Sequence, residues 1–320
     1  MTRDVATPFP VDATGEGERL DGFVGTRLAV SHAAARRLIA DGRVRVDGRL
    51  RAKGDLLHAG ELVTVLRPPE APAVVAAPDE QASRMVVLYE DDALVAIDKP
   101  GGIPSHPLRA GEQGTAANLL CARYPECAAA SLDPREGGLV HRLDTATSGV
   151  LVAARTRDAW QALRRAFAAD QSEKRYLAEV WGLPEDGRIA AAIGRRGRRG
   201  TTVRVDGGRN PQAAETSWTV VARATETTLV MATLHAGRAH QVRAHLAAAG
   251  FPIVGDDRYG RPGATEPAGL RLHAATIAFP HPTTGDRLSI EAPPPAWAKR
   301  PPFGKREPFG KREPFGSKAP

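Results

Sequence analysis

A long succession of short strand patterns, from Met85 to residue 292, constrains the fold of this chain more than any other feature. Apolar residues alternate with polar ones, or form short apolar runs, in the segments 86–90, 93–98, 148–156, 174–182, 214–224, 228–236, 272–279 and 287–292. Helical spacing occurs between them at 115–124, 158–170 and 239–250. Because strands that come in runs pair mainly with antiparallel neighbours, the pattern predicts an α+β fold with a mostly antiparallel, mixed sheet.

The first part of the chain predicts a separate, small α/β unit. Ser31 is placed to cap a helix that ends at Gly42, and its apolar face would carry Ala35, Leu38 and Ile39. A strand over 43–46 then reaches Asp47-Gly48, which is a strong signal for a tight turn. A second strand follows over 61–66.

The length of 320 residues suits two domains. We expect a disordered lead over 1–16, the small unit over 17–67, a Pro/Ala-rich linker over 68–84, the larger unit over 85–298, and a low-complexity tail over 299–320. In that tail the hexapeptide PFGKRE occurs twice in direct succession.

Composition excludes several classes of protein. No stretch approaches the roughly 18 apolar residues of a membrane helix, and the N-terminus has no apolar core of a signal peptide. The only cysteines, Cys121 and Cys127, rule out a disulfide framework and a four-cysteine zinc site. We therefore expect a soluble, cytoplasmic protein that does not engage membranes.

Positive charge is concentrated at the two ends of the chain. Residues 17–67 carry ten Lys/Arg against six Asp/Glu, and residues 299–320 carry seven against two. Residues 68–298 carry 26 of each sign and therefore sum to zero. Since clustered positive charge attracts polyanions, this distribution predicts that the ends bind nucleic acid while the neutral middle does something else.

The pattern SxxxAxxLIxxGxVxVDGxxxxKxxxxxxG, from Ser31 to Gly60, resembles the S4 RNA-binding domain. A helix that ends in two arginines next to a basic hairpin would give one cationic face for RNA phosphates. We expect this face to consist of Arg36, Arg37, Arg43, Arg45, Arg49, Arg51 and Lys53.

The segment GGLVHRLDTATSGVLVAART, residues 137–156, gathers His141, Asp144 and Ser148 just before an apolar strand. A Ser/His/Asp triad is a poor interpretation, because the three lie within eight residues and no GxSxG elbow occurs. A zinc site at His235, His240 and His245 is also disfavoured, because a spacing of five does not keep residues on one helix face.

This segment closely resembles the active-site motif of the RluA-type pseudouridine synthase family, in which HRLD is followed by TSG and an apolar strand. Further family motifs are matched in order by DKPGGIPSHP (98–107), KRY (174–176), AGRAHQVRAHLAAAGFPIVGDDRYG (236–260) and LHAATIAFPHPTTG (272–285). The resemblance covers about residues 19–296. Ala236 and Ala239 depart from the usual third motif. These two departures leave the motif's other polar residues in place, namely Arg238, His240, Gln241 and Arg243.

The resemblance implies isomerisation of uridine to pseudouridine within RNA, without cofactor or metal. It makes Asp144 the catalytic carboxylate, which would capture or stabilise positive charge at the sugar carbon as in glycosidases. Whether this aspartate adds to the sugar or removes a sugar proton to give a glycal stays open. A lone charged aspartate in a dry pocket is costly, and the resemblance implies that Arg243 pairs with it.

The resemblance assigns further residues to the site. Tyr176 would pack against the target base and help to remove its C5 proton. Arg142 would enter the gap that the flipped base leaves in the stack, while His141 organises the loop. Arg238 and His240, in the third motif, are expected to contact RNA.

Two other classes of function compete with this interpretation. A non-catalytic, S4-type RNA-binding assembly factor would not need Asp144 in its HRLD setting, and a small-molecule glycosidase would need paired acidic residues and no S4 unit. By resemblance, family members with an S4 domain favour 23S ribosomal RNA as substrate, with tRNA as the alternative. The family also implies a monomer.

Overall fold

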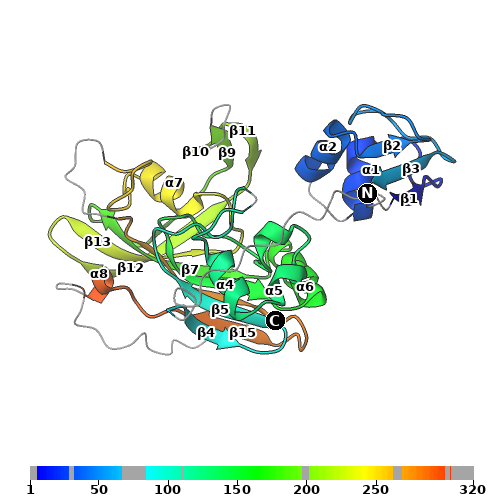
Figure 1. The fold of residues 1–320 in the computed structure, drawn as a ribbon. Helices are drawn as coiled ribbons and strands as arrows, with labels where there is room; N and C mark the ends of the chain where they lie inside the picture. The colour runs from blue at the N-terminus through cyan, green and yellow to red at the C-terminus, as the bar shows by residue number, and fades with distance from the viewer. Residues whose placement is uncertain are drawn as a thin grey trace, which may run out of the picture.

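The computed structural model describes residues 6–28, 32–66, 84–109, 111–196, 202–261, 269–299 and Phe303 (Figure 1). Ser31, most of the expected linker over 68–84, and nearly all of the expected tail over 299–320 lie outside these residues. Within the described part of the chain, no helix has the length and apolar character needed to cross a membrane.

The N-terminal unit is a three-stranded sheet with two helices. Its elements are β1 (Ala6–Pro10), α1 (Leu20–Leu28), α2 (His32–Ala40), β2 (Val44–Val46) and β3 (Leu62–Leu66), and the strand order is β1-β3-β2. Ala35 and Ile39 are buried and Leu38 packs on them, so the expected face of the second helix is confirmed. Helix α1 was not predicted from the sequence, and its Leu20, Phe23 and Val24 complete this core.

The expected disordered lead over 1–16 is wrong for the described residues 6–16. Strand β1 pairs with β3 from Ala6 opposite Leu66 to Pro10 opposite Leu62, and Val11 is buried. The segment was not predicted as a strand because it contains two prolines, and proline cannot donate a ladder hydrogen bond. The strand lies at the sheet edge, where proline is tolerated, so Pro8 and Pro10 do not prevent pairing.

The turn at Asp47-Gly48 is confirmed. Both residues have positive φ, 48° and 73°, and Val46 and Arg49 exchange two backbone hydrogen bonds of 2.9 Å across them. The extended partner of β2 is nevertheless β3, which comes after a loop rather than directly after the turn.

The larger unit contains β4 (Val86–Glu90), β5 (Leu94–Lys99), α4 (Ala116–Arg123), α5 (Cys127–Ala130), η1 (Pro134–Glu136), β6 (Ser148–Ala154), α6 (Arg157–Ala168), β7 (Glu173–Trp181), β8 (Gly187–Ala190), β9 (Ile193–Arg196), β10 (Thr202–Val205), β11 (Arg209–Gln212), β12 (Glu215–Arg223), β13 (Thr227–Leu234), α7 (Gln241–Ala248), β14 (Leu272–Pro280), β15 (Arg287–Glu291) and α8 (Ala296–Lys299). Thr115 caps α4 in a capping box with Asn118, as its position before that helix predicts.

Nine of these strands form one sheet, in the order β4-β5-β6-β14-β7-β13-β12-β8 with β15 beside β14. Among the described strands, only β6 and β14 pair in parallel, so the predicted α+β fold with a mostly antiparallel, mixed sheet is confirmed. The prediction missed the separate sheet β10-β9-β11, because its strands have only four residues each and are too short to give a clear apolar pattern.

The two halves of the large sheet are covered by different helices. Alternate residues of β5 and β6 pack on α4 on one face and on α6 on the other. In the half formed by β7, β12, β13 and β14, α7 covers one face and α8 the other. Tyr176 of β7 packs against both the α4 cluster and the α7 cluster, and so marks the place where the two halves meet.

Candidate active site

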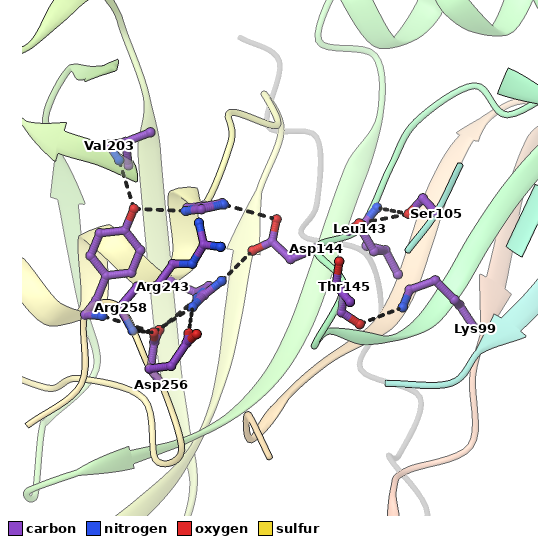
Figure 2. Close-up of polar contacts among 12 residues, drawn as sticks. Lys99, Ser105, Leu143, Asp144, Thr145, Val203, Arg243, Asp256 and Arg258 are labelled. Carbon is purple, nitrogen blue, oxygen red and sulfur yellow. Dashed lines mark hydrogen bonds and ion pairs between the residues drawn. The ribbon is translucent and has the colours of Figure 1, made fainter. Parts of the chain in front are cut away.

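The loop that carries Asp144 runs into β6 and is clamped by the segment after β5. Ser105 Oγ donates to the Leu143 carbonyl (2.8 Å) and accepts from the Leu143 amide (3.0 Å). On the other side of Asp144, the Thr145 carbonyl accepts from Lys99 Nζ (3.2 Å) and from the Gly102 amide (2.8 Å). The backbone on both sides of Asp144 is therefore held by one short turn (Figure 2).

Lys99 is fully buried and gives its ammonium group to backbone carbonyls. Besides Thr145, it donates to Pro100 (2.8 Å) and Ile103 (2.9 Å). Burial lowers the pKa of Lys99 to about 8, although the negative charges of Asp144 and Asp98 oppose this shift. The lysine of the DKPGG motif therefore holds the backbone of the loop that carries Asp144, and it does not line the cavity around Asp144.

A close approach of two strands places the start of β6. Gly149, in the TSG motif, has φ of 109°, and a Cβ atom there would lie 2.2 Å from the Ala274 carbonyl oxygen. Only glycine allows β6 and β14 to pair here. Beside this contact, Ser148 Oγ and His273 Nδ1 lie 2.9 Å apart.

Arg243 joins Asp144 to the loop that follows α7. Its Nη1 donates to Asp144 Oδ2 (3.0 Å), while Nε and Nη2 form a bidentate pair with Asp256 (2.8 and 2.7 Å). Nη2 also reaches Asp257 (3.0 Å). Burial would raise the pKa of Asp256, but Arg243 and the amides of Arg258 and Tyr259 hold it below its ordinary value. Figure 2 shows Asp144 between this cluster and the Lys99–Ser105 clamp.

The second oxygen of Asp144 faces a histidine at the start of α7. His240 has φ of 54°, so the helix begins at Gln241, two residues later than the sequence predicts. Tyr259 Oη accepts from the Val203 amide (2.9 Å) and lies 2.9 Å from His240 Nδ1. On the other side of the ring, His240 Nε2 lies 3.8 Å from Asp144 Oδ1.

Asp144 lines a cavity of about 660 Å³ where the two halves of the sheet meet. This volume lies within the range of ordinary ligand sites, roughly 300–1,000 Å³. Of the residues expected at the site, the cavity collects His141, Arg142, Asp144, Tyr176, Arg238, His240 and Arg243. Further lining groups that the sequence did not single out include Arg164, Lys174 and Arg195.

The pKa values of His141 and Tyr176, which both line the cavity, are strongly shifted. Burial, with Lys174 and Arg164 nearby, lowers the pKa of His141 to about 3, and its Nε2 accepts from the Val152 amide (3.1 Å). Burial and then the charge of Asp144 raise the pKa of Tyr176. His141 is therefore neutral, and its hydrogen bond with the Val152 amide is a structural contact. The Tyr176 hydroxyl keeps its proton, which argues against a tyrosine phenolate as the catalytic base.

Basic side chains surround the opening of the cavity. Arg142 is exposed there, two residues from Asp144. Arg238 donates from Nε to the Ala213 carbonyl (3.3 Å), and its backbone amide bonds Gln241 Oε1 (2.9 Å). Arg164 donates to the Val140 carbonyl (3.2 Å) from α6.

The arginines expected on the N-terminal unit divide into two groups. Arg36 pairs with the buried Asp21 (2.7 Å), and together with Arg19 it lowers the pKa of Asp21 to about 2. Arg51 pairs with Asp55 (3.1 Å) and Glu61 (3.0 Å), so these two arginines support the fold. The second group is exposed to solvent and consists of Arg37, Arg45, Arg49 and Lys53. Arg43 is half-buried.

Several groups that complete the site were missed as functional residues by sequence reasoning, namely Lys99, Ser105, Asp256 and Tyr259. All four lie inside the quoted motifs DKPGGIPSHP and GDDRYG, so the motifs indicated their positions but not their contacts.

Among the described residues, no three His, Cys, Asp or Glu side chains cluster as metal ligands. His245 instead lies 2.9 Å from Thr216 Oγ1 and 3.0 Å from the Ala191 carbonyl.

Similar proteins show which family the chain belongs to. The model of the RNA pseudouridylate synthase family matches residues 93–248, and the S4 domain model matches 18–63. An uncharacterized RNA pseudouridine synthase of Bacillus subtilis (strain 168) is 35% identical over 286 residues, 88% of this chain and 91% of the relative. Ribosomal large subunit pseudouridine synthase D of Neisseria meningitidis serogroup B is 33% identical over 294 residues, 87% of this chain and 76% of the relative.

Among solved structures, human RNA pseudouridylate synthase domain containing 1 matches with a TM-score of 0.56 and 26% identity. The match covers 68% of this chain and 86% of the human one. Since the Bacillus subtilis relative is 35% identical and matches 88% of this chain and 91% of its own length, the chain belongs to the RNA pseudouridylate synthase family.

Proposed function

We propose that this protein converts uridines of large-subunit ribosomal RNA to pseudouridine, with Asp144 as its catalytic carboxylate. One observation carries the residue assignment: Asp144 stands in the wall of the 660 Å³ cavity, clamped through its backbone and joined by Arg243 at 3.0 Å. A guanidinium partner holds a partly buried carboxylate in one orientation through a charge-assisted hydrogen bond. The exposed fraction of the Asp144 side chain, 26%, leaves it accessible from the cavity.

The reaction is an isomerisation in which atoms balance within the substrate. The N1–C1′ bond breaks, the uracil turns, C5 bonds to C1′, the C5 proton leaves and N1 gains a proton. Asp144 either bonds to C1′ as N1 leaves or removes a sugar proton to give a glycal, and it is released when C5 bonds to C1′. Arg243 holds the carboxylate in place, and His240 Nε2 faces its second oxygen.

The remaining lining residues receive the flipped nucleotide. Tyr176 lies where the two hydrophobic clusters meet and offers its ring to the base, and its protonated hydroxyl can donate a hydrogen bond. Arg142, exposed beside the cavity, is placed to fill the gap in the RNA stack. His141 organises the loop through its bond with Val152.

Ribosomal RNA is supported as substrate by two features. Several relatives, including those of Neisseria meningitidis and Xanthomonas campestris, are named ribosomal large subunit pseudouridine synthase D. The N-terminal unit, residues 6–66, matches the S4 domain model and exposes Arg37, Arg45, Arg49 and Lys53. In this proposal that unit binds RNA, residues 85–298 carry out catalysis, and a monomer acts in the cytoplasm.

The experiment that tests this function is tritium release from large-subunit ribosomal RNA transcribed with C5-labelled uridine. We expect wild type to release tritium and Asp144→Asn to release none, because an amide cannot supply the charge, while RNA binding persists. Asp92→Asn, in the exposed β4–β5 turn, is the matched control and should behave as wild type. Release by Asp144→Asn would refute its role, and no release by wild type would favour a non-catalytic assembly factor.

A further inference from the structure

The small sheet β10-β9-β11 concentrates positive charge beside the cavity. Residues 193–212 contain six arginines and a single acidic residue, Asp206. Four of these arginines belong to described strands and are exposed: Arg195, Arg196, Arg204 and Arg209. The zero net charge of residues 68–298 therefore conceals a local excess, and the expectation of an electrostatically neutral middle does not hold for this sheet.

The sheet is anchored rigidly to the elements that build the site. Ile193 and Val203 pack against Ala244 of α7, the helix that carries Arg243. The Val203 amide donates to Tyr259 Oη (2.9 Å), which in turn contacts His240. Figure 1 shows β9, β10 and β11 standing next to α7. These contacts place the backbone of the sheet beside the elements that carry Arg243 and His240.

Strand register decides which arginines face the cavity. Arg195 lies opposite Val203 and opposite Arg209, so these three share one face of the sheet. Val203 is buried against α7 on that face, and Arg195 lines the cavity. Arg196 lies opposite Thr202 and Arg204 opposite Gly194, which puts both arginines on the other face.

The cavity face brings two like charges together. Arg195 and Arg209 are directly opposed across antiparallel strands, where side chains lie about 5 Å apart at Cβ. Next to them, Arg238 is tied to the Ala213 carbonyl just beyond β11 (3.3 Å) and also lines the cavity.

We propose that the cavity face of this sheet, with Arg195 and Arg209, binds the RNA backbone at phosphates flanking the nucleotide that enters the cavity. The proposal rests on the proposed function, because it assumes that the substrate is an RNA strand. A chain of phosphates is the anion that matches this face, because Arg195 and Arg209 are exposed on neighbouring strands and do not enclose a pocket. The sheet thus adds an RNA-binding site next to catalysis, apart from the S4 unit.

Paired charge-removing variants of the full-length protein test this site. Arg195→Gln/Arg209→Gln neutralises the cavity face, and Arg196→Gln/Arg204→Gln removes the same charge from the opposite face of the same sheet. Binding of an unmodified large-subunit ribosomal RNA transcript is measured by filter retention across salt concentrations. Single-turnover tritium release is measured on the same RNA.

The cavity-face variant should flatten the slope of log K against log[salt] by about 1.4, since each phosphate contact on a single strand contributes about 0.7. It should raise KM by a larger factor than it lowers the single-turnover rate at saturating RNA. The opposite-face variant should change the slope by less than half as much, and Arg195→Lys/Arg209→Lys should retain it. Should the glutamine pair fail to fold, Arg195→Gln alone should flatten the slope by about 0.7.

Equal slopes for wild type and the cavity-face variant would overturn the site. Equal flattening by both faces would also overturn it, because long-range attraction would then be sufficient. Failure of the proposed function gives a different result: wild type would release no tritium, while the binding slopes would still report on the sheet.

Discussion

Replacing Arg243 by methionine tests how one guanidinium serves both stability and catalysis. The Asp256 side chain is fully buried and Arg243 is only 4% exposed, and the two share bonds of 2.8 and 2.7 Å. Removing one partner of a buried, hydrogen-bonded ion pair leaves an uncompensated charge and costs about 3–5 kcal/mol. We therefore expect Arg243→Met to lower the free energy of unfolding in urea by about this amount.

A double variant separates the two roles. Asp256 also accepts the amides of Arg258 (2.9 Å) and Tyr259 (3.0 Å), and asparagine keeps an acceptor for them without the charge. Arg243→Met/Asp256→Asn should therefore regain a large part of the lost stability, while single-turnover activity stays lost because Asp144 has no partner. Destabilisation by Arg243→Met of less than about 1 kcal/mol would refute the buried-pair argument. Recovery of turnover in the double variant would show that Arg243 acts only through Asp256.

Two further predictions concern Lys99 and Tyr176. Burial lowers the pKa of Lys99 from 10.5 to about 8, so between these values the unfolded chain binds a proton that the native state has released. The stability of wild type relative to Lys99→Met should therefore rise by up to about 3 kcal/mol from pH 8 to 10.5, and a pH-independent difference in urea unfolding would contradict this. Tyr176→Phe should bind RNA normally but turn over slowly, because the ring remains and the hydroxyl does not; single-turnover rates equal to wild type would leave the hydroxyl without a chemical role.

Local sequence patterns determined the secondary structure and the position of the motifs. The strands around Leu94, Val150 and Val230 and the helix capped by Thr115 follow from periodicity and capping, because burial of one face and satisfaction of end groups are local requirements. Where such signals are weak, the prediction failed: β1 was missed because it contains two prolines, and the sheet β10-β9-β11 was missed because its strands are only four residues long.

Only the tertiary structure decided which motifs meet. Asp144 and Arg243 are 99 residues apart, and Ser105 reaches Leu143 across 38 residues. Those contacts depend on the order of strands in the sheet, above all on β14 lying between β6 and β7, and no local periodicity encodes that order. The motifs named Asp144 and Arg243 by resemblance, but the clamp by Lys99, the sharing of Arg243 with Asp256 and the position of Arg195 at the cavity arise from long-range pairing and packing.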